Sequence, residues 1–282
     1  MQTFGRIEKS SIFSPCDDGE EGINSCCGPS FYREAHRQCD KIPAVLAAVS
    51  DYTEAAETPS EALMGMLQAG IIPVTPFQQN CTIFFDPDTK EGVVVDPGGD
   101  VPLILQAIAQ NGLTIKEIWL THGHLDHAGG ASELKEALGI DVIGPHQDDL
   151  PLLQRIETQA EKYGMSGLRN VVPDRWLKDG DKISFGAHEF EVHHTPGHAP
   201  GHVIYFNRAQ NFAHLGDVLF NGSIGRTDLP GGDHQQLLDS IRDKVLPLGD
   251  DVGFICGHGP GSRIGDERRS NPFLQEIKPR SI

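Results

Sequence analysis

Four side chains that can bind a metal fall within six residues of the 282-residue chain: His122, His124, Asp126 and His127. Imidazole and carboxylate groups are ligands of zinc, iron and manganese. Because the four lie so close in sequence, little loop entropy is lost when they gather around an ion. The alternative is a solvated histidine-rich turn, and three histidines with one aspartate at this spacing argue against it. The segment therefore predicts a metal site.

The elements on either side of this cluster predict how its side chains are presented. A hydrophobic strand is predicted over residues 117–121, and a helix over residues 130–138. Neighbouring side chains of a strand alternate between its faces, whereas a loop can turn successive side chains toward one point. We therefore expect the four candidates in a loop where a strand gives way to a helix.

The order of elements along the chain bears on the fold class. Strand pairs come first, strands and helices alternate in the middle, with a helix over about 147–163, and strand pairs return after residue 182. This order favours a layered α/β or α+β protein over a simple doubly wound sheet. Residues 1–63 show no sustained strand alternation, and a helix is predicted there over residues 43–52. We therefore predict a peripheral or poorly ordered N-terminal extension, 1–63, and a catalytic domain, 64–282.

The pattern His-x-His-x-Asp-His followed by small residues resembles the signature of the metallo-β-lactamase superfamily. The resemblance covers about residues 70–275. It implies a four-layer αββα sandwich, an α/β fold (α+β by some schemes). It also implies further ligands after distant strands, and His198, Asp217 and His258 follow in the expected order. Each stands beside a glycine, which lets the backbone turn close to a metal.

Carried onto this sequence, the superfamily pattern implies two divalent metal ions, with zinc favoured and iron or manganese as alternatives. Seven ligands shared by two ions leave positions open for water, as catalytic sites require. The implied ligands are a first group, a second group and a bridge between them: His122, His124 and His198; Asp126, His127 and His258; and Asp217.

Three residues are candidates for catalytic roles beside metal binding. Asp96 ends a predicted strand, and in the superfamily this aspartate orients the ligands; a simple turn aspartate is the alternative. Asp126 is a catalytic candidate as well as a ligand. Arg226 would offer positive charge to an anionic substrate. His202 lies four residues after His198, and we assign it a supporting or core position.

The implied metal pair points to hydrolysis. It would lower the pKa of a water molecule and supply hydroxide at neutral pH for attack on a carbonyl or phosphorus. Residues 75–81, 95–99, 225–228 and 267–274 look like the corresponding runs of glyoxalase II relatives, which hydrolyse the thioester S-lactoylglutathione. A thiolate leaves readily, since the pKa of its conjugate acid is about 8.5, so no strong general acid is needed. The resemblance therefore predicts a hydrolase for a small-molecule, glutathione-derived thioester.

Other activities stay open. Full-length glyoxalase II carries a C-terminal helical domain that binds glutathione. Here 24 residues follow His258, so the chain resembles the short bacterial branch that lacks this domain. A persulfide dioxygenase of the same superfamily would use a single Fe(II) held by His122, His198 and Asp217. A metallo-hydrolase of another ester or lactone is a further alternative. A metal-storing scaffold is disfavoured because all seven ligands are present.

Composition limits the partners. The formal net charge of −17 repels phosphate backbones, so we expect no nucleic-acid partner. No run of about 18 apolar residues predicts a membrane span, and the N-terminus does not resemble a secretory signal, so we expect the cytoplasm.

Cys81 and Cys256 lie in apolar runs and are predicted core residues. The oligomeric state is left open. Four cysteines match no standard disulfide or zinc spacing and are expected as reduced thiols: Cys16, Cys26, Cys27 and Cys39.

Overall fold

The computed structural model describes residues 45–48 and 65–277. Most of the predicted extension, residues 1–63, therefore lies outside the described residues, as do Cys16, Cys26, Cys27 and Cys39. The domain boundary predicted near residue 64 stays a prediction.

The first sheet is mixed and, within the described residues, has seven strands in the order β1-β2-β3-β4-β5-β6-β7. β1 to β4 pair antiparallel, whereas β4 to β7 pair parallel. β3 is buried along its whole length, as expected for a strand covered on both faces. The strands are β1 (Val45–Ala48), β2 (Gln68–Val74), β3 (Gln79–Phe85), β4 (Glu91–Val95), β5 (Thr114–Trp119), β6 (Asp141–His146) and β7 (Arg175–Leu177).

The second sheet has, in the part of the chain that the structure describes, six strands in the order β15-β14-β11-β10-β9-β8. β8 to β11 form an antiparallel meander, and β11 pairs parallel with β14. A separate ribbon joins β12 and β13. The strands are β8 (Lys182–Phe185), β9 (His188–His194), β10 (Val203–Asn207), β11 (Phe212–His214), β12 (Leu219–Phe220), β13 (Ser223–Ile224), β14 (Gly253–Ile255) and β15 (Ser262–Arg263).

The helices are mostly short. α7 continues into a π turn, η4 (Ile241–Val245), and the 3-10 turns of the described residues are η3 (Gln147–Asp149), η5 (Leu246–Leu248) and η6 (Leu274–Glu276). The α-helices are α2 (Val101–Gln110), α3 (Leu125–Ala128), α4 (Ala131–Leu138), α5 (Leu150–Leu153), α6 (Ile156–Lys162), α7 (His234–Ser240) and α8 (Ile264–Ser270).

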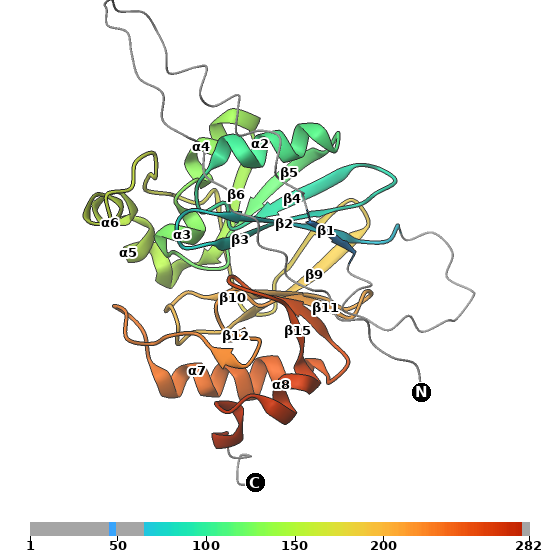
Figure 1. The fold of residues 1–282 in the computed structure, drawn as a ribbon, viewed down its shortest axis with the longest axis vertical. Coiled ribbons are helices and arrows are strands. Elements are labelled where there is room, and N and C mark those ends of the chain that lie inside the picture. Colours follow the sequence, from blue (N-terminus) through green and yellow to red (C-terminus); the bar gives the residue numbers. More distant parts are fainter. Residues whose placement is uncertain (1–44, 49–64, 278–282) are drawn as a thin grey trace, which may run out of the picture. The chain divides into compact units, whose positions relative to one another are not determined.

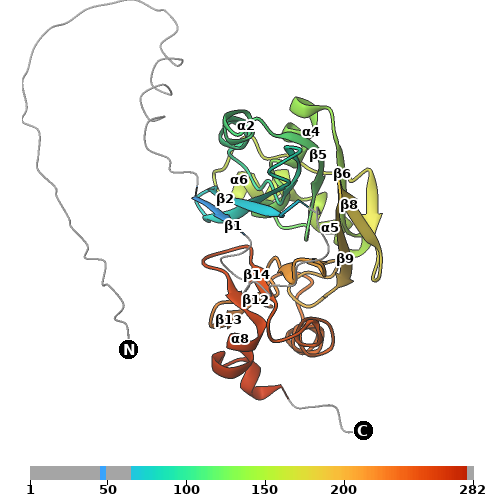
Figure 2. The same ribbon diagram turned by 90° about the vertical axis from the view of Figure 1, so that its right-hand side faces the viewer.

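In residues 65–277, three hydrophobic cores separate four layers. Ile104 of α2 belongs to the core between the helices and the first sheet. Trp119 and Phe190, whose rings are 5.2 Å apart, pack between the two sheets. Leu237 of α7 belongs to the core beneath the second sheet. Figures 1 and 2 show α2 and α4 at one side of the sheets and α7 and α8 at the other. The predicted four-layer αββα sandwich is therefore confirmed.

Two predicted helices are wrong in part. The helix expected over 147–163 is divided into η3, α5 and α6, because the Leu153 carbonyl accepts a hydrogen bond from the distant Val171 N–H instead of continuing the helix. The helix expected over 43–52 is replaced at Val45–Ala48 by β1, which pairs with β2. Sheet pairing there overrides local helix propensity.

The strand directions bring the ends of several strands to one place. β4, β5 and β6 are parallel, so Asp96, residues 122–127 and the turn after β6 follow them at one edge of the first sheet. β9, β11 and β14 run in one direction, so the segments carrying His198, Asp217 and His258 leave the second sheet at one edge. The topology therefore gathers segments that are distant in sequence.

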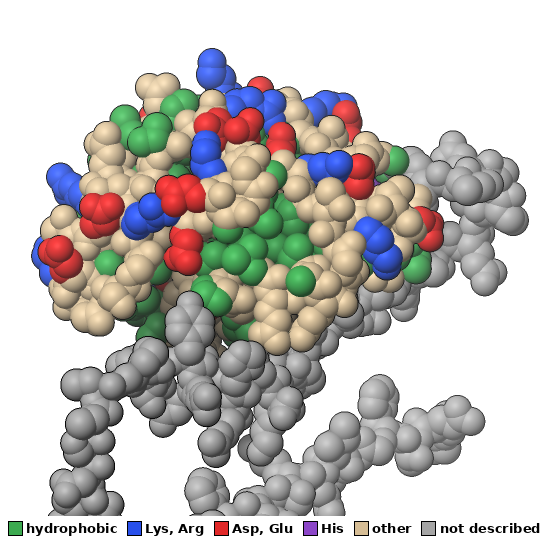
Figure 3. Space-filling model, turned by 90° about the horizontal axis from the view of Figure 1, so that it is seen from above, with side chains coloured by type: hydrophobic (Ala, Val, Ile, Leu, Met, Phe, Trp, Pro, Cys, Tyr) green, Lys and Arg blue, Asp and Glu red, His purple; other side chains and the backbone are tan. Residues whose placement is uncertain are grey.

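The molecular surface mixes charges of both signs. Seen from the side of α2 and α4, acidic and basic side chains lie next to one another around an apolar patch (Figure 3). Among the described residues, charged side chains of opposite sign form ion pairs, including Lys116 with Glu91 at 2.6 Å and Arg169 with Glu136 at 3.0 Å. Among the described residues, the structure contains no helix with the length and apolarity needed to span a bilayer.

Candidate metal centre

The loops after β5 and β9 bring His122, His124 and His198 together. One ring nitrogen of each lies within 4.8 Å of the others, and His122 Nε2 is 3.0 Å from His124 Nδ1. All three are buried. Gly197, at φ 133°, lets the loop after β9 pack closely against α7, because a Cβ at this position would lie 2.2 Å from the Leu237 nitrogen. The first predicted ligand group is therefore assembled from two loops.

The second group combines α3 with the loop after β14. Asp126 Oδ2 lies 3.3 Å from His258 Nε2, and His127 Nε2 lies 3.4 Å from the same nitrogen. α3 is a single turn, in which the N–H groups of His127 and Ala128 donate to the carbonyl of His124. This turn lets two consecutive side chains, Asp126 and His127, reach one centre.

Asp217 lies between the two groups. Its Oδ2 is 3.4 Å from His198 Nε2 and 3.6 Å from His258 Nε2, while its Oδ1 is 3.4 Å from His127 Nε2. Gly257 makes room for this carboxylate, because a Cβ at that position would lie 2.0 Å from Asp217 Oδ1. The carboxylate thus contacts histidines of both groups, as a bridging ligand would.

The spacing of these atoms fits metal ligands better than direct hydrogen bonds. Zinc with ligands at 2.0–2.1 Å in a tetrahedron separates neighbouring ligand atoms by about 3.3 Å. The contacts among Asp126, Asp217, His127 and His258 include several at 3.3–3.6 Å, beyond the usual hydrogen-bond range. Within the described chain, the buried His198 Nε2 makes no hydrogen bond. Such an orphaned acceptor is costly, and a cation would satisfy it.

Hydrogen bonds on the outer side of two histidines set their tautomers. His127 Nδ1 lies 2.9 Å from Asp96 Oδ2, and an ionised carboxylate only accepts, so Nδ1 carries a proton. His198 Nδ1 donates to the backbone carbonyl of Arg226 at 2.8 Å. In the neutral rings, both Nε2 atoms then turn a lone pair toward the centre.

Asp96 also acts through Thr121. Its two oxygens accept from the Thr121 N–H at 2.7 Å and the Thr121 hydroxyl at 2.6 Å. The same hydroxyl lies 3.0 Å from His122 Nδ1 and accepts from it, which leaves His122 Nε2 as the inward acceptor. The fully buried Asp96 thereby contacts His127 of the second group directly and acts on His122 of the first group through Thr121. Thr121 was not identified from the sequence, where a threonine at a strand end has no distinguishing pattern.

The pKa shifts of the histidines differ between the two ligand groups. Burial, then neighbouring histidines, lowers the pKa of His122, and lowers that of His124 to about 3, so both are neutral and able to ligate. Burial also acts to lower the pKa of His127, but Asp217 and Asp126 raise it above its usual value. Burial would raise the pKa of Asp217, but His127 and other histidines lower it. Negative charge thus gathers beside His127, where a cation would take the place of a proton.

Comparison with known proteins identifies the family. A model of the metallo-β-lactamase superfamily matches residues 74–258. The chain belongs to the metallo-β-lactamase superfamily. The hydroxyacylglutathione hydrolase GloC of Haemophilus influenzae is 45% identical to this superfamily member over 205 residues, which are 72% of this chain and 96% of that protein.

Solved structures of the superfamily agree. BLEG-1, described as a B3 metallo-β-lactamase, is 38% identical with a TM-score of 0.68, covering 73% of this chain and 99% of that one. TTHA1623, in a di-iron-bound form, is 37% identical with a TM-score of 0.66, covering 72% and 99%. The predicted family and enzyme class, a glyoxalase II-like metallo-hydrolase, are therefore confirmed. Membership of this superfamily and the clustered histidines and aspartates imply divalent metal ions.

Arg226 and His202 lie beside the ligands in different ways. The Arg226 guanidinium is exposed and binds Asp228 through two contacts of 2.7 Å, so its backbone carbonyl, on His198, is the part that touches the centre. His202 Nε2 accepts from the Asp217 N–H at 3.0 Å, and its ring stacks on His122 with centroids 4.8 Å apart. His202 therefore supports ligands rather than joining them.

Asn80 supports the loop of His258, a role that the sequence did not reveal. Its side-chain amide donates to the carbonyls of Cys256 and Gly259 at 2.9 and 2.8 Å, and its backbone N–H donates to Gly257. These bonds join β3 to a loop more than 170 residues away in sequence. Only the folded chain reveals such a contact.

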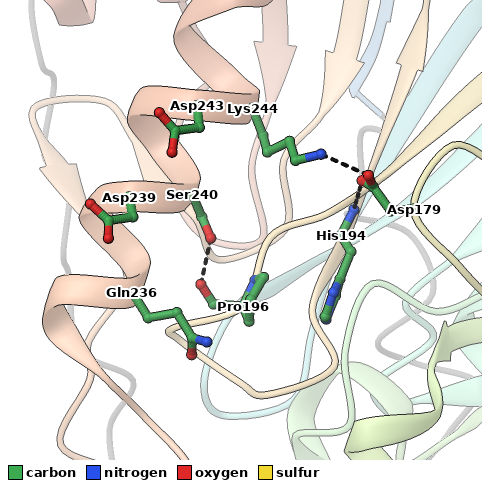
Figure 4. Close-up of a pocket in the computed structure, with 8 residues that line it drawn as sticks. All are labelled: Asp179, His194, Pro196, Gln236, Asp239, Ser240, Asp243 and Lys244. Carbon is green, nitrogen blue, oxygen red and sulfur yellow. Dashed lines mark hydrogen bonds and ion pairs between the residues drawn. The ribbon is translucent and has the colours of Figure 1, made fainter. Parts of the chain in front are cut away.

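A second cluster lies outside this centre and is a poorer metal site. His146, Asp148 and His194 lie within 4.8 Å of one another. The two rings stack at 4.2 Å and 24°, so their in-plane lone pairs run side by side instead of converging. His194 also lines a surface pocket of about 300 Å³ against α7, where Lys244 pairs with Asp179 at 2.7 Å (Figure 4). We assign no metal there.

Proposed function

We propose that this protein hydrolyses a small-molecule thioester, with S-lactoylglutathione as the favoured substrate, at a centre that binds two divalent metal ions. The observation that carries the proposal is that seven candidate ligands from four loops converge on a site that is open on one side. The side chains of His258 and Asp126 are 31% and 18% exposed, whereas that of His127 is fully buried. Substrate would therefore approach past His258 and Asp126.

When bound, the ions would supply hydroxide at neutral pH and polarise the thioester carbonyl. The chain's own residues prepare that chemistry. Asp126 and Asp217 provide negative charge, and Asp96 with Thr121 holds ring nitrogens of both groups in orientation. Because a thiolate is a good leaving group, no side chain of the protein has to act as a strong general acid.

The substrate class is supported by the similarity to the hydroxyacylglutathione hydrolase of Haemophilus influenzae. The two sequences are 45% identical, and the match covers 96% of that protein. The exposed Arg226 would attract an anionic substrate. Its ion pair with Asp228 is exposed to solvent and screened by salt, and a substrate carboxylate would compete with Asp228 for the guanidinium. We propose zinc as the metal; the di-iron form of TTHA1623 supports iron as the alternative.

The compartment that we propose is the cytoplasm. Cys81 and Cys256 are buried free thiols. Free thiols are typical of reducing compartments.

The test is turnover of S-lactoylglutathione by the purified full-length chain, followed by loss of the thioester's ultraviolet absorbance, alongside elemental analysis. We expect about two equivalents of metal, loss of activity with a chelator and recovery with Zn²⁺. His258→Ala should abolish turnover, whereas His234→Ala, an exposed histidine on α7, should not. Oxygen consumption with glutathione persulfide, or cleavage of a β-lactam without thioester cleavage, would contradict the proposed substrate.

A further inference from the structure

Asp149 is a fully buried carboxylate at the end of η3, just after β6. Its Oδ2 accepts a hydrogen bond from the Gly123 N–H at 2.7 Å, and its Oδ1 accepts one from the Gly201 N–H at 2.5 Å. Gly123 lies between His122 and His124 in the sequence. One carboxylate therefore holds the backbone between two candidate ligands.

The other partner, Gly201, belongs to the loop that carries His198. Both glycines lie directly against the turn of Asp149. A Cβ at Gly201 would be 2.6 Å from the Asp149 nitrogen, and a Cβ at Gly123 would be 3.1 Å from the Asp149 carbonyl oxygen. The helix that follows, α5, lies beside α3 (Figure 1). The two loops of the first ligand group are thus joined through a single side chain.

This arrangement is costly for the fold alone. Burial raises the pKa of Asp149 to about 7, although both backbone N–H groups act to lower it. A buried carboxylate held by neutral donors costs stability compared with an apolar side chain of similar shape. Its two bonds go to the loops of one metal site, which favours a function in that site over a purely structural one.

We propose that Asp149 is a positioning residue of the metal centre, which sets the separation between the loop of His122 and His124 and the loop of His198. The inference rests on the metal centre of the proposed function. Asp149 is not one of the seven candidate ligands; it acts through the backbone of Gly123 and Gly201.

The experiment measures metal affinity in the full-length chain, not turnover. Wild type, Asp149→Asn and Asp149→Ala are stripped with a chelator and titrated with Zn²⁺ in competition with a chromophoric chelator. His198→Ala lacks a ligand of the first group, and His258→Ala lacks a ligand of the second group. The absorption spectra of their Co²⁺ forms serve as references that show which ligand group an Asp149 variant affects. Asp86→Asn is the matched control: Asp86 is also buried and accepts two backbone N–H groups, but lies at the far end of β3.

Asp149→Asn keeps the shape and one of the two bonds, so it should fold and weaken the first group about 10-fold; Asp149→Ala should approach about 100-fold. The cobalt spectrum should change as in His198→Ala. Zinc affinity should be unchanged in Asp86→Asn even where its melting temperature falls as much. Wild-type affinity in both Asp149 variants, or equal affinity loss in Asp86→Asn, would overturn the assignment. A wild type that binds both ions but cleaves no thioester would overturn the substrate and leave Asp149's role standing.

Discussion

Asp96→Asn tests most directly how the candidate ligands are oriented. The carboxylate accepts from the Thr121 N–H, the Thr121 hydroxyl and His127 Nδ1 at 2.7, 2.6 and 2.9 Å. Asparagine has the same shape, but one of its terminal atoms donates instead of accepting. With its oxygen on the Thr121 N–H, its NH₂ group faces His127 Nδ1. His127 must then accept at Nδ1 and carry its proton on Nε2, the nitrogen that faces the centre.

The magnitude follows from these contacts. Replacing a charged acceptor of three hydrogen bonds by a neutral group of equal volume should cost about 1–3 kcal/mol of folding stability. Supporting bonds of this kind typically change metal affinity by about 10–100-fold, which is about 1.4–2.7 kcal/mol. Both ligand groups should weaken, because the Thr121 hydroxyl loses the acceptor that also orients His122.

The assay is Zn²⁺ competition on the chelator-stripped protein, with thermal unfolding measured in parallel. Asp86→Asn is again the control, since Asp86 accepts from two backbone N–H groups and lies 3.1 Å from His188 Nε2. It lies six positions along the chain from Asn80, or about 20 Å at the rise of a β-strand. It should lose stability without losing zinc affinity. Asp96→Asn with wild-type affinity for both ions would refute the reasoning.

Three further predictions concern other groups. Asp217→Ala should lower bound metal below two equivalents and turnover by at least about 100-fold, checked by elemental analysis and kinetics; unchanged turnover would contradict the bridging role. Burial raises the pKa of Cys256 to about 12 and that of Cys81 above its usual value, so thiol reagents at about pH 8 should leave both unmodified until the protein unfolds, as read by peptide mass spectrometry. Burial lowers the pKa of His214 to about 4. The unfolded chain then takes up this proton first, so in metal-free protein His214 should contribute a loss of about 3 kcal/mol as pH falls from about 6.5 to about 4. Urea unfolding of His214→Gln should show a shallower dependence, and an equal slope would argue against it.

The local part of the candidate site could be predicted from the sequence because its information is local. Three histidines and an aspartate within residues 122–127 need one loop to bring them together, and the flanking strand and helix were recognisable. His198, Asp217 and His258 were located through resemblance, since spacing alone does not connect positions so far apart. The N-terminal extension stays a prediction.

By itself, then, the sequence determined the layered fold class and the four clustered candidate ligands of residues 122–127, because these depend on residue types, hydrophobic periodicity and short spacings; its motifs gave the superfamily and the three distant ligands through resemblance. Tertiary structure alone decided which backbone groups meet Asp149, how Asp96 and Thr121 orient ring nitrogens, and where the helix predicted over 147–163 is interrupted. The physical reason is the same in each case. A hydrogen bond from Gly201 to Asp149, or from Val171 to Leu153, joins residues that only the packing of the strands and loops brings within 3.5 Å.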